Sequence, residues 1–132
     1  MSDPISTLLN GHDPLVAIVG ATDNPHKYGS VIYRDLKAKG YRVVPVNPHR
    51  ATVAGDDAFP TLAALPAAPD VVNFVVPPDQ TLAVLREAKE LGYTTVWVQP
   101  GASSPAVEDY LVEGGFAYLA NACIMVQAPV RA

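Results

Sequence analysis

The stretch that decides the fold is Leu15-Val-Ala-Ile-Val-Gly20-Ala-Thr-Asp-Asn-Pro-His-Lys-Tyr-Gly29. A short apolar run stops at a glycine, a polar loop follows, and a helical pattern begins near Tyr28. An uninterrupted apolar run is typical of a strand that is buried on both faces. Where such a strand meets a helix, backbone N–H groups and the helix N-terminus converge on one point, which suits a phosphate or a pyrophosphate. We therefore predict a strand, a phosphate-binding loop and a helix.

The glycines of this loop are not those of the NAD fingerprint. That fingerprint is G-x-G-x-x-G, whereas Thr22 and Pro25 stand between Gly20 and Gly29. The Thr22 hydroxyl can donate to a phosphate oxygen, and Lys27 can neutralise a phosphate as a point charge. The alternatives are an ordinary strand-to-helix turn and a solvated lysine.

Strands and helices are predicted to alternate along the rest of the chain. The further strands are Arg42–Val46, an edge strand near Asp57–Phe59, Val71–Val76, Thr94–Val98 and Phe116–Leu119. The helices run from Tyr28 to a stop at Gly40, briefly from Thr61 to Pro66, from Asp79 to a stop at Gly92, and from a Ser104 cap through Val112. This order predicts an α/β fold, three-layered, doubly wound and Rossmann-like, with a mostly parallel sheet of five or six strands. We expect residues 1–14 to be an N-terminal extension and residues 15–132 to be the domain.

Turn-forming and polar residues gather where the predicted strands end. These segments are Gly20–Thr22, Asn47-Pro48, Val76–Pro78, Gln99–Gly101 and Ala120-Asn121. In a doubly wound sheet the carboxyl ends of the strands meet at one edge, and ligands bind there at the switch point of the strand order. We therefore predict a binding site on this edge.

The end of the second strand indicates which nucleotide fits. NAD sites usually place Asp or Glu there for the ribose 2′-hydroxyl, but the run Val46-Asn47-Pro48-His49-Arg50 contains no acid. Asn, His and Arg tolerate or attract a phosphorylated ribose, so the candidates are NADP, with a 2′-phosphate, and coenzyme A, with a 3′-phosphate. A solvated loop is the alternative for His49 and Arg50.

Pro77 and Pro78 give the next strand a stiff, apolar end because they remove two backbone donors. Such a rim suits the face of an adenine ring or a pantetheine arm. The alternative is that the two prolines only end the strand.

Composition limits the partners. A chain of 132 residues with 49% hydrophobic residues is large enough for one domain with a core. Its net charge of −4 argues against nucleic acid, and no run of about 18 apolar residues is present to cross a membrane. A single cysteine, Cys123, cannot form an internal disulfide, so we expect a cytoplasmic protein.

No catalytic or metal-ligating set is discernible. His12, His26 and His49 share no ligand spacing with one another or with Cys123, so no metal site is expected. The apolar neighbours of Cys123 favour a buried structural thiol. We expect a binding protein more than an enzyme, and we keep an NADP-binding oxidoreductase-like module and a ligand-free interaction scaffold as alternatives. A homodimer or another protein partner stays open.

Six motifs in order support a resemblance to a known family. They are Val19–Gly29, Gly40–Pro48, Phe59–Leu62, Asp70–Val72, Val98–Gly101 and Cys123–Val126. Over about Ile18 to Val126 the chain resembles the small stand-alone CoA-binding proteins, whose domain is similar to the nucleotide-binding domain of the succinyl-CoA synthetase α subunit. The ligase portions of that synthetase have no counterpart here, so the resemblance implies no ligase chemistry.

The resemblance implies a Rossmann-like domain that binds coenzyme A or an acyl-CoA as a non-catalytic carrier, sensor or partner subunit. It places one group of residues around the pyrophosphate: Gly20, Ala21, Thr22, Lys27 and Tyr28. It places Asn47 and Pro48 at the adenosine end, with Val76 and Pro77 further along the site. We predict that Gly20→Val abolishes binding without unfolding the domain, because the valine side chain would fill the space of the phosphates.

Overall fold

A five-stranded parallel sheet forms the centre of the protein. The computed structural model describes residues 13–127. Its elements are β1 (Leu15–Val19), α2 (Tyr28–Ala38), β2 (Arg42–Val46), β3 (Thr52–Val53), β4 (Asp56–Asp57), the 3-10 helix η1 (Leu62–Ala64), β5 (Val71–Phe74), α3 (Pro78–Leu91), β6 (Thr95–Val98), α4 (Pro105–Glu113), β7 (Ala117–Ala120) and α5 (Ile124–Gln127). The sheet has the order β2-β1-β5-β6-β7, so the predicted Rossmann-like α/β fold is confirmed.

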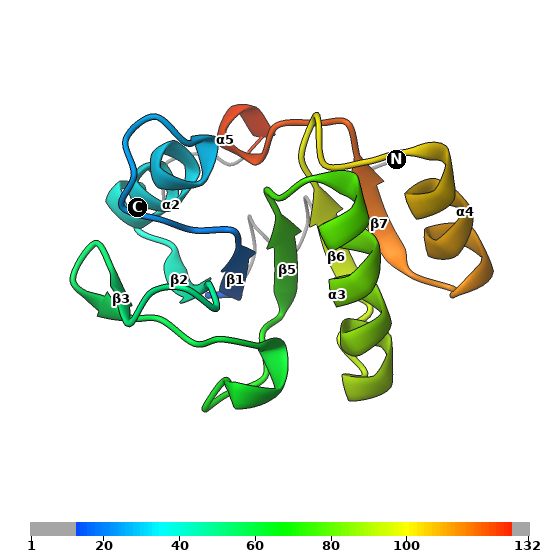
Figure 1. Ribbon diagram of the computed structural model, residues 1–132, viewed down its shortest axis with the longest axis horizontal. Helices are drawn as coiled ribbons and strands as arrows, with labels where there is room; N and C mark the ends of the chain where they lie inside the picture. The colour runs from blue at the N-terminus through cyan, green and yellow to red at the C-terminus, as the bar shows by residue number, and fades with distance from the viewer. Residues whose placement is uncertain (1–12, 128–132) are drawn as a thin grey trace.

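Helices cover both faces of this sheet (Figure 1). Successive side chains of a strand point to opposite faces, so each buried strand serves two cores. In β1, Val16 and Ile18 pack in the core beneath α2 and α5. Ala17 and Val19 pack in the other core, which η1, α3 and α4 cover. This arrangement explains why β1 is an unbroken apolar run.

The switch point of the sheet lies between β1 and β5. From β1 the chain crosses to β2 on one side and later returns to β5 on the other. Val19 therefore pairs with both Val46 of β2 and Phe74 of β5. Because the crossovers leave in opposite directions, a crevice opens at the carboxyl ends of these strands.

The segment after β2 differs from the prediction of one edge strand near Asp57–Phe59. It forms a two-residue hairpin, in which Thr52 pairs with Asp57, and Phe59 then makes a parallel bridge to Val46. The turn residues Ala54 and Gly55 have φ values of 51° and 82°. Two left-handed residues suit a tight hairpin, but alanine seldom takes this conformation, so the turn could not be predicted from its residue types.

The predicted helix caps at Thr61 and Ser104 are present. The Thr61 hydroxyl accepts from the Ala64 N–H at 3.3 Å, and the Ser104 hydroxyl accepts from the Val107 N–H at 3.2 Å. Across residues 13–127, no helix is both long enough and apolar enough to cross a membrane.

Candidate functional site

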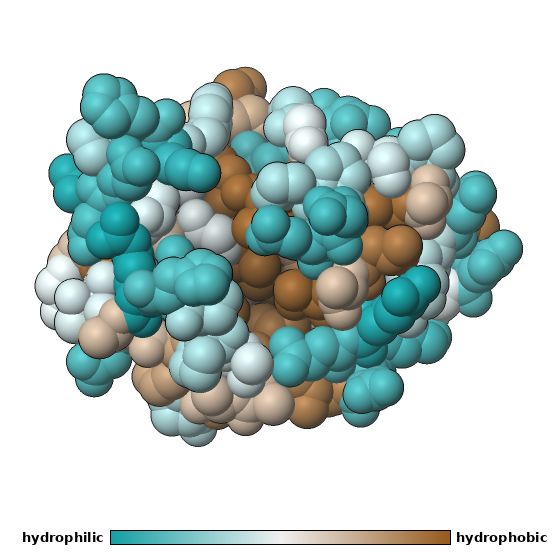
Figure 2. Space-filling model, viewed as in Figure 1, coloured by the Kyte–Doolittle hydropathy of each residue, from teal (hydrophilic) through white to brown (hydrophobic). Residues whose placement is uncertain are grey.

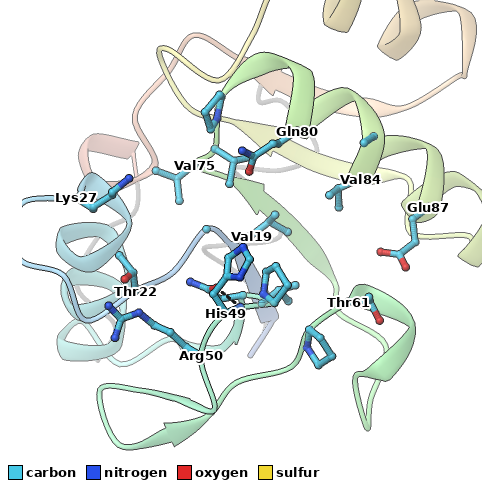
Figure 3. A pocket seen from close by; sticks show the side chains of 18 of the residues that line it. Val19, Thr22, Lys27, His49, Arg50, Thr61, Val75, Gln80, Val84 and Glu87 are labelled. Carbon is cyan, nitrogen blue, oxygen red and sulfur yellow. Dashed lines mark hydrogen bonds between the residues drawn. The ribbon is translucent and has the colours of Figure 1, made fainter.

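A cavity of about 570 Å³ lies at the carboxyl ends of β1, β2 and β5. The β1–α2 loop and the turn after β2 form one side, and α3 with the segment before η1 forms the other (Figure 3). Figure 2 shows a hollow with a hydrophobic floor between polar rims on this face of the molecule. The floor comes from the ends of the strands, including Val19, Val46 and Val76.

Gly20 and Gly29 each stand at a close backbone contact, Gly20 against the residues after β5 and Gly29 against Gly20 itself. Gly20 has a φ of 101°, and a Cβ atom there would lie 2.7 Å from both the Val75 carbonyl oxygen and Cγ1 of Val76. A Cβ atom on Gly29 would overlap the carbonyl oxygen of Gly20. The structure therefore contradicts our expectation that Gly20→Val leaves the fold intact: the valine side chain would collide with Val75 and Val76, just after β5, before it reached a ligand.

The β1–α2 loop uses much of its own hydrogen-bonding capacity. The Thr22 hydroxyl accepts from the Asn24 N–H at 3.2 Å, and Asn24 Oδ1 accepts from the His26 N–H at 3.0 Å. The Lys27 N–H donates to the Asn24 carbonyl at 3.0 Å. These bonds hold the loop in one shape and leave the Thr22 hydroxyl proton available to a ligand. Thr22, Asn24 and Lys27 are the residues of this loop beyond Gly20 that line the cavity.

Asn47 joins the turn after β2 to the β1–α2 loop. Its Nδ2 donates to the Ala21 carbonyl at 2.9 Å, and its Oδ1 accepts from the His49 N–H at 2.8 Å. Both ends of the amide are thus engaged within the protein. Asn47 lines the cavity mainly as a spacer that fixes where His49 and Arg50 stand.

The structure brings most of the predicted site residues together. Those that line the cavity are Gly20, Thr22, Lys27, Asn47, Pro48, Val76 and Pro77. Ala21 is fully buried in the core beneath α2 and does not line it. Tyr28 is 54% exposed, and its hydroxyl lies 3.8 Å from Cys123 Sγ instead. Ala21 therefore serves packing, and the Tyr28 hydroxyl contacts the start of α5.

Sequence reasoning missed the wall that α3 provides. The α3 residues of this wall are Gln80, Ala83, Val84 and Glu87, and Pro60 and Thr61 line the cavity from the segment before η1. Ala83, Val84 and Glu87 follow Gln80 by three, four and seven residues, so these four side chains share one side of α3. Glu87 Oε1 accepts from the Leu62 N–H at 3.1 Å, which ties α3 to η1 at this wall. The helical spacing was visible in the sequence. The packing of the segment before η1 beside α3 was not, because the two are distant along the chain.

The cavity has a cationic end and an acidic end. Lys27, His49 and Arg50 stand on the side of the β1–α2 loop, and Glu87 stands on the far side near Thr61 (Figure 3). Valines line the space between them. A ligand with an anionic group at one end and a flat, weakly polar group at the other matches this polarity.

Cys123 differs from the buried structural thiol that we expected. The residue is partly exposed just before α5, and its Sγ lies 3.5 Å from the Gln99 amide nitrogen. Burial by itself would raise the pKa of the thiol, but hydrogen bonds from Gln99, the Met125 backbone and Tyr28 lower the pKa overall. Apolar neighbours in sequence gave no sign of these contacts, because Gln99 and Tyr28 come from distant parts of the chain.

Comparisons with known proteins agree with this geometry. The model of a family described as a CoA binding domain matches residues 15–129. A solved structure of a conserved hypothetical protein from Pyrococcus furiosus is 42% identical, with a TM-score of 0.83, and the match covers 86% of this chain and 98% of that chain. YneT, an uncharacterized protein of Bacillus subtilis (strain 168), is 27% identical over 111 residues, which cover 84% of this chain and 82% of YneT.

One relative is a subunit of a larger enzyme whose activity is known by name. The α subunit of acetate–CoA ligase (ADP-forming) II from Pyrococcus furiosus is 32% identical over 78 residues. The match covers 58% of this chain and 17% of that subunit, so the similarity concerns a small part of the ligase.

Proposed function

The chain belongs to the CoA binding domain family, and from this premise we propose that it binds coenzyme A or an acyl-CoA in the cavity beside α3. The position of the cavity carries the proposal, because doubly wound sheets bind nucleotides at the carboxyl ends of the strands beside the switch point. The volume of about 570 Å³ lies within the usual span of small-molecule sites, roughly 300–1,000 Å³.

The pyrophosphate is proposed to bind at the cationic end. Thr22 offers a hydroxyl donor and Lys27 a point charge. Lys27 is the N-cap of α2, so the positive end of the helix dipole lies beside this end of the cavity.

The adenosine is proposed to lie along the apolar floor. Pro48 and Val76 flank this path, and Asn47 holds the rim in place. Glu87 at the far end accepts hydrogen bonds and repels phosphate, which favours the base over the phosphates at that end. The pantetheine arm then leaves the cavity past Pro77, which contributes apolar contact without a competing N–H group.

The proposed role is that of a non-catalytic carrier, sensor or partner subunit. Similarity to part of the α subunit of a ligase supports the partner-subunit role. No ligase activity is proposed, because the chain spans 17% of that relative. The partner is proposed to be a second copy of the chain or another protein. A single free cysteine suits a reducing compartment such as the cytoplasm.

NADP binding is the second candidate. The observation that favours it is the turn after β2, where His49 and Arg50 line the cavity and no acid stands. That turn suits a phosphorylated ribose of either cofactor. Family membership favours coenzyme A.

Calorimetric titration with coenzyme A, acetyl-CoA, NADP, NAD and ATP tests the proposal. We expect binding of coenzyme A, and about 2.7 kcal/mol of added stability at 100 times Kd. Ala83→Phe places a ring in the cavity from an exposed position of α3 and should abolish binding. Glu90→Phe adds the same ring to an exposed position that does not line the cavity and should leave binding intact. Preference for NADP over coenzyme A in the unmodified protein would reverse the assignment.

A further inference from the structure

We propose that Cys123 accepts the acyl group of a bound acyl-CoA, so that the protein carries this group covalently as a thioester. The inference rests on the proposed function and adds a covalent site to it. Cys123 follows β7 by three positions, and Gln99 and Val75 directly follow β6 and β5. Since parallel strands all end on one edge, the thiol stands at the same edge of the sheet as the cavity.

Two residues connect the cavity with the thiol. Val75 lines the cavity and also packs against the core that includes Ile124, the residue after Cys123. Lys27 lines the cavity, and the next residue, Tyr28, places its hydroxyl 3.8 Å from Cys123 Sγ. In Figure 3, Lys27 and Val75 stand at the side of the cavity that faces the pale red helix α5. A pantetheine arm that leaves the cavity on this side is therefore directed toward the thiol.

Several hydrogen-bond donors converge on the sulfur. Gln99 Nε2 lies 3.5 Å from Cys123 Sγ, and the Tyr28 hydroxyl approaches the same atom. Burial raises the pKa of the thiol, but the bonds from Gln99, the Met125 backbone and Tyr28 lower it overall. A thiol is only a weak acceptor, so this set of donors suits a thiolate, the form of cysteine that attacks a carbonyl carbon.

Two buried amides hold the main donor in place. Gln99 Oε1 accepts from Asn73 Nδ2 at 3.0 Å and from the Ile124 N–H at 2.9 Å, so Gln99 Nε2 is left to face the sulfur. Asn73 is fully buried in β5, and within residues 13–127 its Oδ1 has no hydrogen-bond partner. Such an amide is costly in a core. Its cost is explained if Asn73 serves to orient Gln99 toward the thiolate.

The proposed step exchanges one thioester for another. The Cys123 thiolate attacks the carbonyl carbon of the acyl-CoA, a new carbon–sulfur bond forms, and the carbonyl π electrons move onto the oxygen. When the carbonyl forms again, the bond to the CoA sulfur breaks. Coenzyme A leaves as a thiolate and takes up a proton equivalent to the one that Cys123 released to water. The step needs no oxidant or reductant, and free coenzyme A reverses it, which suits a carrier.

The test is incubation of the unsubstituted protein with acetyl-CoA near neutral pH, followed by intact-mass measurement and peptide mapping. We expect one acetyl group on Cys123 that hydroxylamine removes, because hydroxylamine cleaves thioesters and leaves acetyl-lysine intact. S-Acetyl-N-acetylcysteamine presents the same thioester without the nucleotide. At equal concentration acetyl-CoA should react at least about tenfold faster, since binding raises the local concentration of its thioester.

Variants separate delivery by the cavity from reactivity of the thiol. Ala83→Phe should remove the advantage of acetyl-CoA while the small thioester still reacts, and Glu90→Phe, outside the cavity, should keep it. Tyr28→Phe should slow transfer at neutral pH about threefold to tenfold, the scale of one hydrogen bond, and Tyr118→Phe should not. Cys123→Ser should gain no acetyl group that hydroxylamine removes as a thioester.

A parallel calorimetric titration with coenzyme A separates this inference from the proposed function. If coenzyme A binds but acetyl-CoA leaves Cys123 free, or acylates it no faster than the small thioester does, the covalent role is refuted while CoA binding stands. An advantage of acetyl-CoA that survives Ala83→Phe would also refute delivery through the cavity. If neither coenzyme A nor acetyl-CoA binds and acetyl-CoA has no advantage, both proposals are overturned.

Discussion

Gly29 at the start of α2 packs directly on the carbonyl oxygen of Gly20 at the end of β1, so that a Cβ atom on Gly29 would overlap this oxygen. Helix and strand are therefore separated by backbone alone. The contact sets how closely α2 approaches the sheet, and with it the shape of the β1–α2 loop that borders the cavity.

We expect Gly29→Ala to lower the free energy of unfolding by about 2–3 kcal/mol, the upper part of the usual range for an inserted methyl group, because the atom that it meets is backbone and cannot turn away. Gly55→Ala is the control. A Cβ atom there has no neighbour within 4 Å, but φ is 82°, so the change should cost about 1 kcal/mol through backbone strain alone. Urea denaturation measures both; equal losses would argue against the close backbone contact.

Thr22→Val should weaken coenzyme A binding about tenfold, since valine keeps the size of threonine and lacks the hydroxyl donor. Thr22→Ser keeps the hydroxyl and should retain most of the affinity. Thermal unfolding of both variants checks that the loop, in which Thr22 also accepts from the Asn24 N–H, remains folded. Unchanged affinity in a folded Thr22→Val protein would exclude Thr22 from the phosphate site.

Tyr33→Phe should reduce stability at pH 7 by about 1–2 kcal/mol, because it removes the hydrogen bond from the buried phenol to Asp56 Oδ2 at 2.6 Å. This bond and the one from Lys37 lower the pKa of Asp56 below its ordinary value. A carboxyl group with a lowered pKa stabilises the fold above the unfolded value, near pH 4, and loses this contribution as the pH falls through the folded value.

The acid dependence of unfolding should therefore be shallower in Asp56→Asn than in the unmodified protein. Asp57→Asn, at the exposed neighbouring position, should retain the full dependence. Chemical denaturation between pH 2 and pH 7 measures the difference. Identical slopes for all three proteins would mean that the Tyr33–Asp56 bond does not form in solution.

Cys123 should react with iodoacetamide faster at neutral pH than an ordinary cysteine of equal exposure, because its lowered pKa leaves more thiolate. Tyr28→Phe removes one of the hydrogen bonds that lower this pKa, so the pH profile of alkylation should move to higher pH. Tyr118→Phe changes an exposed tyrosine elsewhere and should leave the profile in place. A profile that is insensitive to Tyr28→Phe would show that the phenol does not interact with the thiol.

The sequence by itself determined the sheet. Continuous apolar strands such as Leu15–Val19 require cover on both faces, and helices with stop signals such as Gly92 supply it, so the parallel order followed from local pattern and the rules of handedness. The carboxyl edge of the strands was predictable for the same reason. Gly20, Thr22, Asn47 and Val76 lie there because they directly follow strands.

Only the tertiary structure decided which side of that edge is hollow. Residues that directly follow the same strand can face opposite sides of the sheet, so Ala21 is buried beneath α2 while Thr22 lines the cavity. The wall formed by Glu87 and Thr61, and the contact of Tyr28 with Cys123, join segments that are distant in sequence. No local pattern encodes such contacts, because they depend on how the helices and the β3–β4 hairpin pack against the finished sheet.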